Sequence, residues 1–343
     1  MRKIHHSKRR PLRLGYVALS DCAPLAMARS LGLFEKYSLP VELSREVGWA
    51  TIRDKVISGE LDAAHAPAGM LVGMHCGIRS VQAPCLTGLV LNLNGNAITL
   101  SETLWKKGVR DGASLRAHLT ATRERLTFGI VYQHSSHAFL LRHWLRSHGI
   151  DPDRDVQLVI VPPAQVYGNL KAGHLDGYCV GEPWNSLAVM SRIGWVPATS
   201  AELEPRHPEK VLLIHRDFAE AHEAEHLALI AALIEACRFC DQPANRDRLL
   251  ETLAEFISAP IHAVEMSMRG TFDYGHGRIE KTGPQHIFHE GNANDPSADK
   301  AAWVIGHFLD PSAITDPSLI PPETAARCFR SDLFHQALAL TKK

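Results

Sequence analysis

The chain has 343 residues, 45% of them hydrophobic, which is long enough for two ordinary domains with buried cores. The 37 basic and 37 acidic residues balance, so no large basic face is expected and direct binding of nucleic acid is disfavoured. No segment approaches the roughly 20 apolar residues that span a bilayer. The basic start, MRKIHHSKRR, lacks the apolar run of an export signal, so we expect a cytoplasmic protein without membrane insertion.

In chain order, the first predicted elements alternate between strands and helices. The predicted strands are residues 12–21, 39–43 and 61–67, and the predicted helices are residues 23–39 and 49–58. This βα order predicts a mostly parallel sheet, whose ligands bind at the carboxyl ends of the strands beside helix N-termini.

The same order of elements returns in the middle of the chain. The predicted strands are residues 126–133 and 156–163, with a helix at residues 135–150 between them. Five pairs of identical residues lie 114 positions apart in the two copies: Gly15 and Gly129, Val17 and Val131, Gly59 and Gly173, Leu61 and Leu175, and Asp62 and Asp176. We therefore predict two similar α/β lobes with a ligand site in the cleft between them.

The last third of the chain is less regular. Residues 216–254 predict a helical region, whereas residues 270–316 are rich in Gly, Asn, Asp and Pro and predict a loop-rich tail that packs on the first lobe.

Four histidines lie in the stretch VYQHSSHAFLLRHWLRSHGI, residues 131–150. His134 and His137 are three residues apart, but no further ligand at a recognisable spacing accompanies them, so we predict no metal site. His137 follows Ser135 and Ser136, which are good helix N-caps, and a protonated imidazole at a helix start suits an oxyanion. The alternative is a His137 side chain that only faces solvent in an open cleft.

Five segments resemble motifs of the nitrate- and bicarbonate-binding proteins of the NrtA and CmpA type. In order they are LGYVALSDCAPLAMARSLGLFEKYSLPVEL, GWATIRDKVISGELDAAH, LNLNGNAITLS, DPDRDVQLVIVPPAQVYGNLKAGHLDGYCVGEPWN and HPEKVLLIHRDF. The resemblance implies a type II periplasmic-binding-protein fold with two α/β lobes. Together with the repeat, it predicts lobe 1 in residues 11–100 plus 200–343 and lobe 2 in residues 101–199.

The resemblance also implies the ligand-binding residues, which are Trp49, Asn96, His137 and Lys210. The family usually has Gln where this chain has Asn96, whose side chain is one methylene shorter. Considered alone, Lys210 is a typical solvated surface charge, Trp49 a typical core residue and Asn96 a typical turn residue. Glu182 in the GEPWN motif either holds the lobe junction or helps to position a cation, and the rigid proline beside it favours the structural role.

Two functions follow from the resemblance. The first is a cytoplasmic nitrate or nitrite sensor of the NasS type, in which the ligand closes the lobes and releases an RNA-binding antiterminator of the NasT type. The alternative is the substrate-binding component of an ABC-type nitrate or bicarbonate transporter that works with a permease. An enzyme is disfavoured, because the seven cysteines are dispersed and no catalytic triad or carboxylate pair is visible, and no cofactor is expected.

Overall fold

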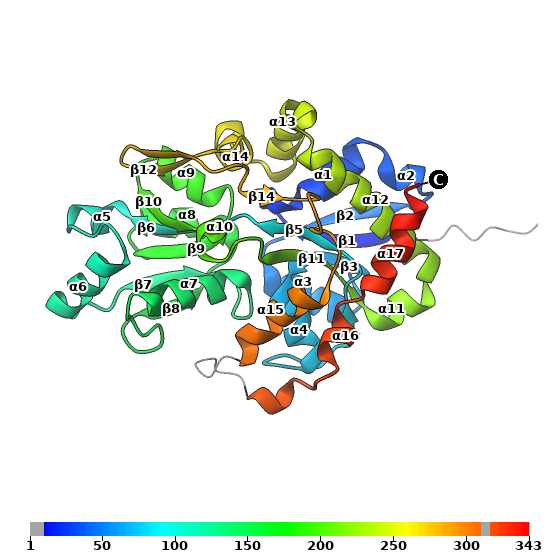
Figure 1. Ribbon diagram of the computed structural model, residues 1–343, viewed down its shortest axis with the longest axis horizontal. Coiled ribbons are helices and arrows are strands. Elements are labelled where there is room, and N and C mark those ends of the chain that lie inside the picture. The colour runs from blue at the N-terminus through cyan, green and yellow to red at the C-terminus, as the bar shows by residue number, and fades with distance from the viewer. Residues whose placement is uncertain (1–9, 310–315, 343) are drawn as a thin grey trace, which may run out of the picture.

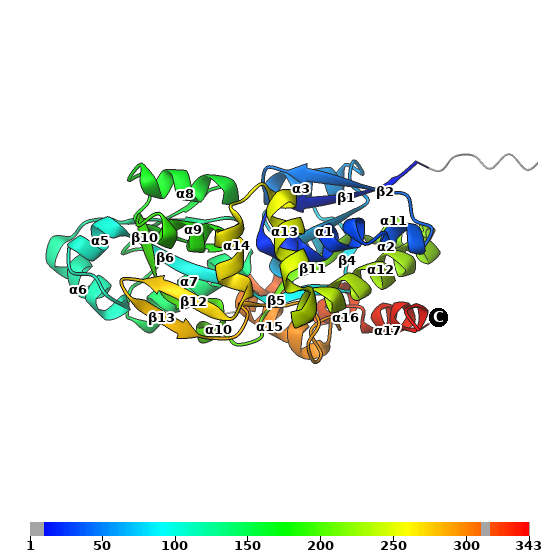
Figure 2. The same ribbon diagram turned by 90° about the horizontal axis from the view of Figure 1, so that it is seen from above.

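The computed structural model describes residues 10–309 and 316–342, and its two main β-sheets lie at opposite ends of the long axis (Figure 1). Residues 1–9 and 310–315, which include the basic start and the end of the predicted loop-rich tail, lie outside the described residues. Figure 2 shows the two parts from above, with helices packed around each sheet. The molecule is thus a two-lobed α/β protein, as predicted.

The first sheet combines strands from both ends of the chain. Its order is β14-β5-β11-β3-β1-β2, and β4 pairs with β11 beside this path. β1 is parallel to β2 and β3, whereas β11 is antiparallel to β3 and β5. The strands are β1 (Leu12–Val17), β2 (Val41–Glu46), β3 (Ala63–Pro67), β4 (Cys85–Leu86), β5 (Val90–Asn94), β11 (Pro208–His215) and β14 (His286–Ile287).

The second sheet has the order β10-β6-β9-β7-β8. β7 is parallel to β8 and β9, whereas β6 is antiparallel to β9 and β10. The strands are β6 (Asn96–Ser101), β7 (Thr127–Ile130), β8 (Gln157–Ile160), β9 (Gly177–Gly181) and β10 (Gly194–Thr199).

The two sheets follow one plan, which confirms the internal repeat. The order β5-β11-β3-β1-β2 corresponds strand for strand to β10-β6-β9-β7-β8, and the bounds of β3 and β9 are 114 residues apart. Strand β6 follows the first copy but joins the second sheet, and β11 follows the second copy but joins the first. In matching registers, Asn96 at the start of β6 pairs with Gly181, and Lys210 near the start of β11 pairs with Pro67.

A pair of aspartates explains why the repeat is visible in the sequence. The Asp62 carboxylate accepts a hydrogen bond from the backbone N–H of Arg13 at 2.8 Å, at the start of β1. The Asp176 carboxylate accepts one from the backbone N–H of Thr127, also at 2.8 Å, at the start of β7. Each aspartate therefore satisfies a backbone donor at the start of the first strand of its own copy.

The helices cover both sheets and join the two lobes. Their bounds are α1 (Ala23–Ser30), α2 (Leu33–Lys36), α3 (Trp49–Ile57), α4 (Ala68–Cys76), α5 (Glu102–Lys106), α6 (Gly112–Thr122), α7 (Ser136–Ser147), α8 (Pro163–Lys171), α9 (Trp184–Met190), α10 (Ser200–Leu203), α11 (Arg216–Ala221), α12 (Glu223–Asp241), α13 (Arg246–Ile257), α14 (Ile261–Met268), α15 (Ala298–Leu309), α16 (Thr324–Cys328) and α17 (Ser331–Leu340). Short 3₁₀ turns lie at η1 (Ser20–Cys22), η2 (Pro243–Asn245) and η3 (Pro317–Leu319).

The last third of the chain is more structured than its composition predicts. The predicted helical region 216–254 forms α11, α12 and α13, which are separated near His222 and at Pro243. The tail predicted as loop-rich contains α15 and a hairpin of β12 (Thr271–Gly275) and β13 (Arg278–Lys281). Phe272 and Tyr274 of this hairpin pack with residues of the second lobe, whereas α15 and α16 pack on α4 of the first lobe.

The predicted lobe boundaries remain a proposal. The chain passes from the first sheet to the second between β5 and β6, and it returns between β10 and β11. Glu182 holds this region together, since its backbone N–H donates to the carbonyl oxygen of Gly95 and its carbonyl oxygen accepts from the N–H of Ser20, at 3.1 and 2.7 Å. Its carboxylate also accepts a hydrogen bond from the N–H of Ser186 at 3.1 Å. These contacts agree with the structural role that the sequence favours for Glu182.

Candidate functional site

Lys210 lies at the centre of a fully buried cluster where elements of the two sheets meet. Its Nζ lies 2.6 Å from Oδ2 of Asp21 and is also hydrogen-bonded to Oε1 of Glu209. Burial lowers the pKa of Lys210, but the two carboxylates outweigh burial and raise this pKa above its usual value. Lys210 therefore remains a cation at neutral pH, although water does not reach it.

Asp21 links the lysine to the first lobe. It lies in η1, directly after β1, and its Oδ1 is 2.8 Å from Nε2 of His65 on β3. Burial favours the neutral acid, but Lys210 and His65 reverse that effect and hold the pKa of Asp21 well below its usual range. Burial also lowers the pKa of His65, so the imidazole is mainly neutral at pH 7. Asp21 and Lys210 thus form a buried ion pair.

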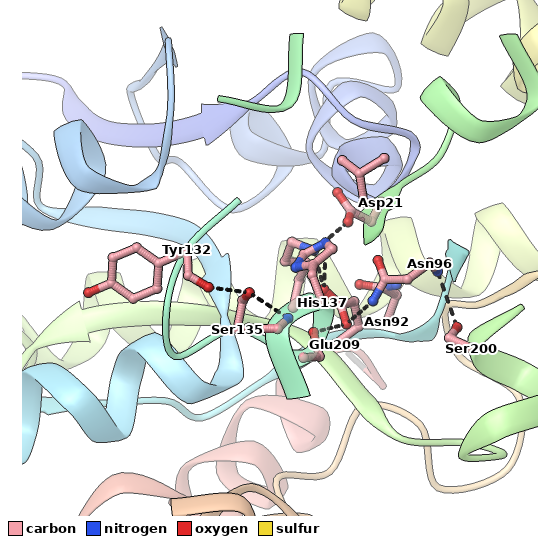
Figure 3. Close-up of polar contacts among 12 residues, drawn as sticks. Asp21, Asn92, Asn96, Tyr132, Ser135, His137, Ser200 and Glu209 are labelled. Carbon is pink, nitrogen blue, oxygen red and sulfur yellow. Dashed lines mark hydrogen bonds and ion pairs between the residues drawn. The ribbon is translucent and has the colours of Figure 1, made fainter. Parts of the chain in front are cut away.

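Glu209 gathers donors from both lobes (Figure 3). Its Oε2 accepts a hydrogen bond from Nδ2 of Asn96 at 2.6 Å and another from the hydroxyl of Ser136. On the other oxygen, Nε2 of His137 lies 3.5 Å from Oε1. Burial raises the pKa of Glu209, but Lys210 and the nearby imidazoles lower it to about 2. The carboxylate is therefore ionised at neutral pH.

His137 lies at the start of α7, as predicted. Ser135 caps this helix, because its hydroxyl oxygen accepts a hydrogen bond from the N–H of Ala138 at 3.3 Å. His137 is fully buried, and burial lowers its pKa to about 4 although Glu209 favours the charged form. Without a ligand, the imidazole that the sequence predicted to be protonated is therefore mainly neutral at pH 7. The side chain does not face solvent, so the alternative interpretation is wrong.

Trp49 begins α3 and lies beside the lysine. Its ring centroid is 5.3 Å from Nζ of Lys210, within the range of a cation–π contact, and 5.6 Å from the ring of His65. The side chain is buried, and its indole N–H has no hydrogen-bond partner among the described residues. Oδ1 of Asn96 and Nδ1 of His137 are also buried without a hydrogen-bond partner among the described residues. Unused donors and acceptors are thus concentrated around the cluster.

The structure brings together all four side chains predicted to bind a ligand. Asn96, His137 and Lys210 converge on the Glu209 carboxylate, and Trp49 lies against Lys210. The sequence analysis missed Asp21, His65 and Glu209. A buried lysine requires a carboxylate partner, so a ligand site at Lys210 implies a nearby acid, but the sequence does not indicate which acid it is.

Within residues 10–309 and 316–342, no group of three or more His, Cys, Asp or Glu side chains is arranged to hold a metal ion. None of the helices in the same part of the chain is both long enough and apolar enough to cross a membrane.

Residues 5–254 match the model of the NMT1-like family. The chain belongs to this family. The periplasmic nitrate-binding protein NrtA from Synechocystis PCC 6803 has a similar crystal structure, with a TM-score of 0.90 and 26% identity over 97% of this chain and 89% of that one. This match confirms both the predicted fold and the resemblance to the NrtA and CmpA type.

Two curated relatives from Synechococcus elongatus extend the comparison. The nitrate/nitrite binding protein NrtA is 32% identical, over 94% of this chain and 76% of the relative. The bicarbonate transport ATP-binding protein CmpC is 40% identical over 86% of this chain but only 44% of its own length. The chain thus spans less than half of this ATP-binding relative.

Proposed function

We propose that the chain binds a small planar oxyanion, nitrate or nitrite, between its lobes and serves as the substrate-binding part of an ABC-type import system. The observation that carries this proposal is the convergence of Asn96, His137 and Lys210 on one carboxylate. A carboxylate has the planar O–C–O geometry of a small oxyanion, so a set of donors that surrounds one also suits the other. Binding rather than catalysis agrees with the name of the NrtA relatives.

The transport role is supported by the relatives. The similar proteins described above are named for nitrate or bicarbonate transport or for nitrate binding, and none is named as a sensor. The interpretation as a cytoplasmic sensor that releases an antiterminator therefore has only the original resemblance behind it. Copurification from cells grown without nitrate, followed by elution with nitrate, separates the two: release of an RNA-binding protein would favour the sensor, and capture of transporter subunits would favour import.

The binding proposal is tested by titration calorimetry of the purified chain with nitrate, nitrite, bicarbonate and sulfate. We expect saturable binding of nitrate or nitrite, and weaker binding of sulfate, because its second negative charge would have to be buried. Preferential binding of bicarbonate would keep the site but change the ligand. If none of the four anions binds between pH 5.5 and 8, the proposed function is wrong.

A further inference from the structure

The Glu209 carboxylate lies in the place that the predicted ligand residues would surround. Three of the four predicted ligand residues contact this carboxylate or approach it within 3.5 Å, and Ser136 at the first turn of α7 donates to it as well. The donors come from β6 and α7 on one side and from β11 on the other. Glu209 is therefore held as an oxyanion would be held.

The net charge of the buried cluster disfavours the binding of a further anion. Asp21 and Glu209 are ionised, Lys210 is the only cation among these three groups, and the sum is one negative charge. A bound nitrate would raise this to two negative charges around a single ammonium group, in a place that is closed to water. Uncompensated buried charge is strongly unfavourable, so a further positive charge must enter with the anion.

We propose that Glu209 is an internal oxyanion that competes with the ligand, and that the ligand binds together with one proton. This inference rests on the proposed function and adds a mode of regulation to the same site. Nitrate takes over hydrogen bonds of the Glu209 carboxylate, and a proton from solvent neutralises the displaced carboxylate or an imidazole next to it. The net charge of the closed cluster is then the same with and without ligand.

The proton has several possible positions among the titratable groups of the cluster. The groups that interact with Glu209 are Lys210, His65, His137, His207 and His286, and Asp21 contacts Lys210 on its other side. Burial lowers the pKa of each of the four imidazoles, so all of them are mainly neutral at pH 7, and each has a nitrogen that can accept a proton when a new anion arrives. The Cys179 thiol also interacts electrostatically with Glu209. Burial raises the pKa of this thiol well above its usual value, so the thiol stays neutral.

Among the imidazoles, His137 and His207 are the nearest to the displaced carboxylate. Nε2 of His137 is 3.5 Å from Oε1, and Nδ1 of His207 is 3.7 Å from Oε2. Protonation of Glu209 itself or of either ring would give the same net charge. The proposal therefore predicts the number of protons taken up and does not depend on which of these groups holds the proton.

Calorimetric titration with nitrate at pH 7.5, in two buffers with different ionisation enthalpies, measures the proton uptake directly. We expect close to one proton per nitrate, and an apparent Kd that falls about tenfold for each unit by which the pH is lowered from 8 towards 6. The Glu209→Gln variant removes the internal anion and keeps an amide at this position. We expect it to bind nitrate at least tenfold more tightly at pH 7.5, with a weaker pH dependence.

Glu235→Gln is the matched control. Glu235 is also a carboxylate that accepts hydrogen bonds from a lysine and a hydroxyl, those of Lys36 and Tyr37, but it lies away from the cluster. This variant should bind nitrate like the parent. The control therefore separates the loss of an internal competitor from a general effect of losing a paired carboxylate.

The possible outcomes separate this inference from the proposed function. If the parent binds nitrate without proton uptake, or if Glu209→Gln binds equally or more weakly, the competition is wrong while the binding function stands. If neither protein binds nitrate, nitrite or bicarbonate at any pH tested, the binding function is wrong and the competition is wrong with it. Should Glu209→Gln fail to fold, the proton uptake of the parent decides alone.

Discussion

The two copies of the repeat share a backbone plan but differ in the side chains that they bring to the cluster. Asp62 and Asp176 make the same contact with the first strand of each copy. The cluster residues of the first copy have no like counterparts in the second. At positions 114 residues further on, Asp21 corresponds to Ser135, Trp49 to Pro163 and His65 to Cys179.

The difference separates the residues that build the fold from those that act in the site. The first copy supplies Asp21, Trp49 and His65, whereas the second supplies the N-terminus of α7 with Ser136 and His137. The exchanged strands also differ, since Asn96 and Lys210 occupy equivalent positions and only one is charged. Substitutions at equivalent positions can therefore test which part each residue plays.

The largest expected effect is on stability and comes from substitutions in the two exchanged strands, β6 and β11. Lys210→Met leaves Asp21 and Glu209 buried without their cation, so we expect a loss of about 3–5 kcal/mol in the free energy of unfolding at pH 7.5. Asn96→Ala removes one hydrogen bond from Glu209 and should cost about 1–3 kcal/mol. Urea denaturation followed by circular dichroism measures both values.

Equal losses for the two variants would contradict the charge asymmetry between the copies. The pH dependence provides a further check. Without the ammonium group, burial raises the pKa of both carboxyl groups, so acidification should restore part of the stability that Lys210→Met loses.

The second effect concerns ligand affinity and the helix of the second copy. His137→Ala removes a buried imidazole next to the site, and we expect nitrate binding to weaken by about 1.5–3 kcal/mol, the range for a hydrogen bond to a charged group. His143 lies on the same helix but is exposed, so His143→Ala should bind nitrate like the parent. A similar loss in both variants would indicate damage to α7 and not the removal of a ligand contact.

The repeat and the fold were predictable because they depend on local patterns. Helix α3 and helix α8 have bounds 114 residues apart, and the identical residues that mark the repeat, such as Asp62 and Asp176, make backbone contacts that hold a strand in place. The irregular tail was predicted less well. α15 contains Gly306 and lies between segments rich in turn residues, so local composition hides a helix that packing on α4 stabilises.

The composition of the cluster was only partly predictable. Regular alternation along a strand places consecutive residues on opposite faces, so Glu209 and Lys210 would not be expected to share one site. The pairing of β11 with β5 shifts register on both sides of Lys210. This irregularity allows both side chains to be buried together. Asp21 and His65 meet only through the packing of η1 against β3, which no spacing in the sequence indicates.

The smallest expected effect compares the two framework aspartates. Both accept a backbone hydrogen bond, but Asp62 also pairs with Arg10 at 2.7 Å. Burial raises the pKa of Asp62, and the hydrogen bonds with Arg10 and Arg13 outweigh this effect and lower it. Arg10 is 59% exposed, so the ion pair is screened by solvent and is worth about 1 kcal/mol at most. Asp62→Asn should therefore cost about 1 kcal/mol at pH 7, and Asp176→Asn less.

The sign of the pH dependence follows from the lowered pKa of Asp62. The contribution of this group is fully present above the pKa of the unfolded chain, about 4, and is lost as the pH falls through the lower pKa of the folded state. Unfolding of both variants and the parent in urea, at pH 7 and at successively lower pH, checks this directly. We expect the difference in the free energy of unfolding between Asp62→Asn and the parent to become smaller in acid. A difference in the free energy of unfolding that stays constant with pH would mean that Asp62 acts through the geometry of its hydrogen bonds and not through its charge.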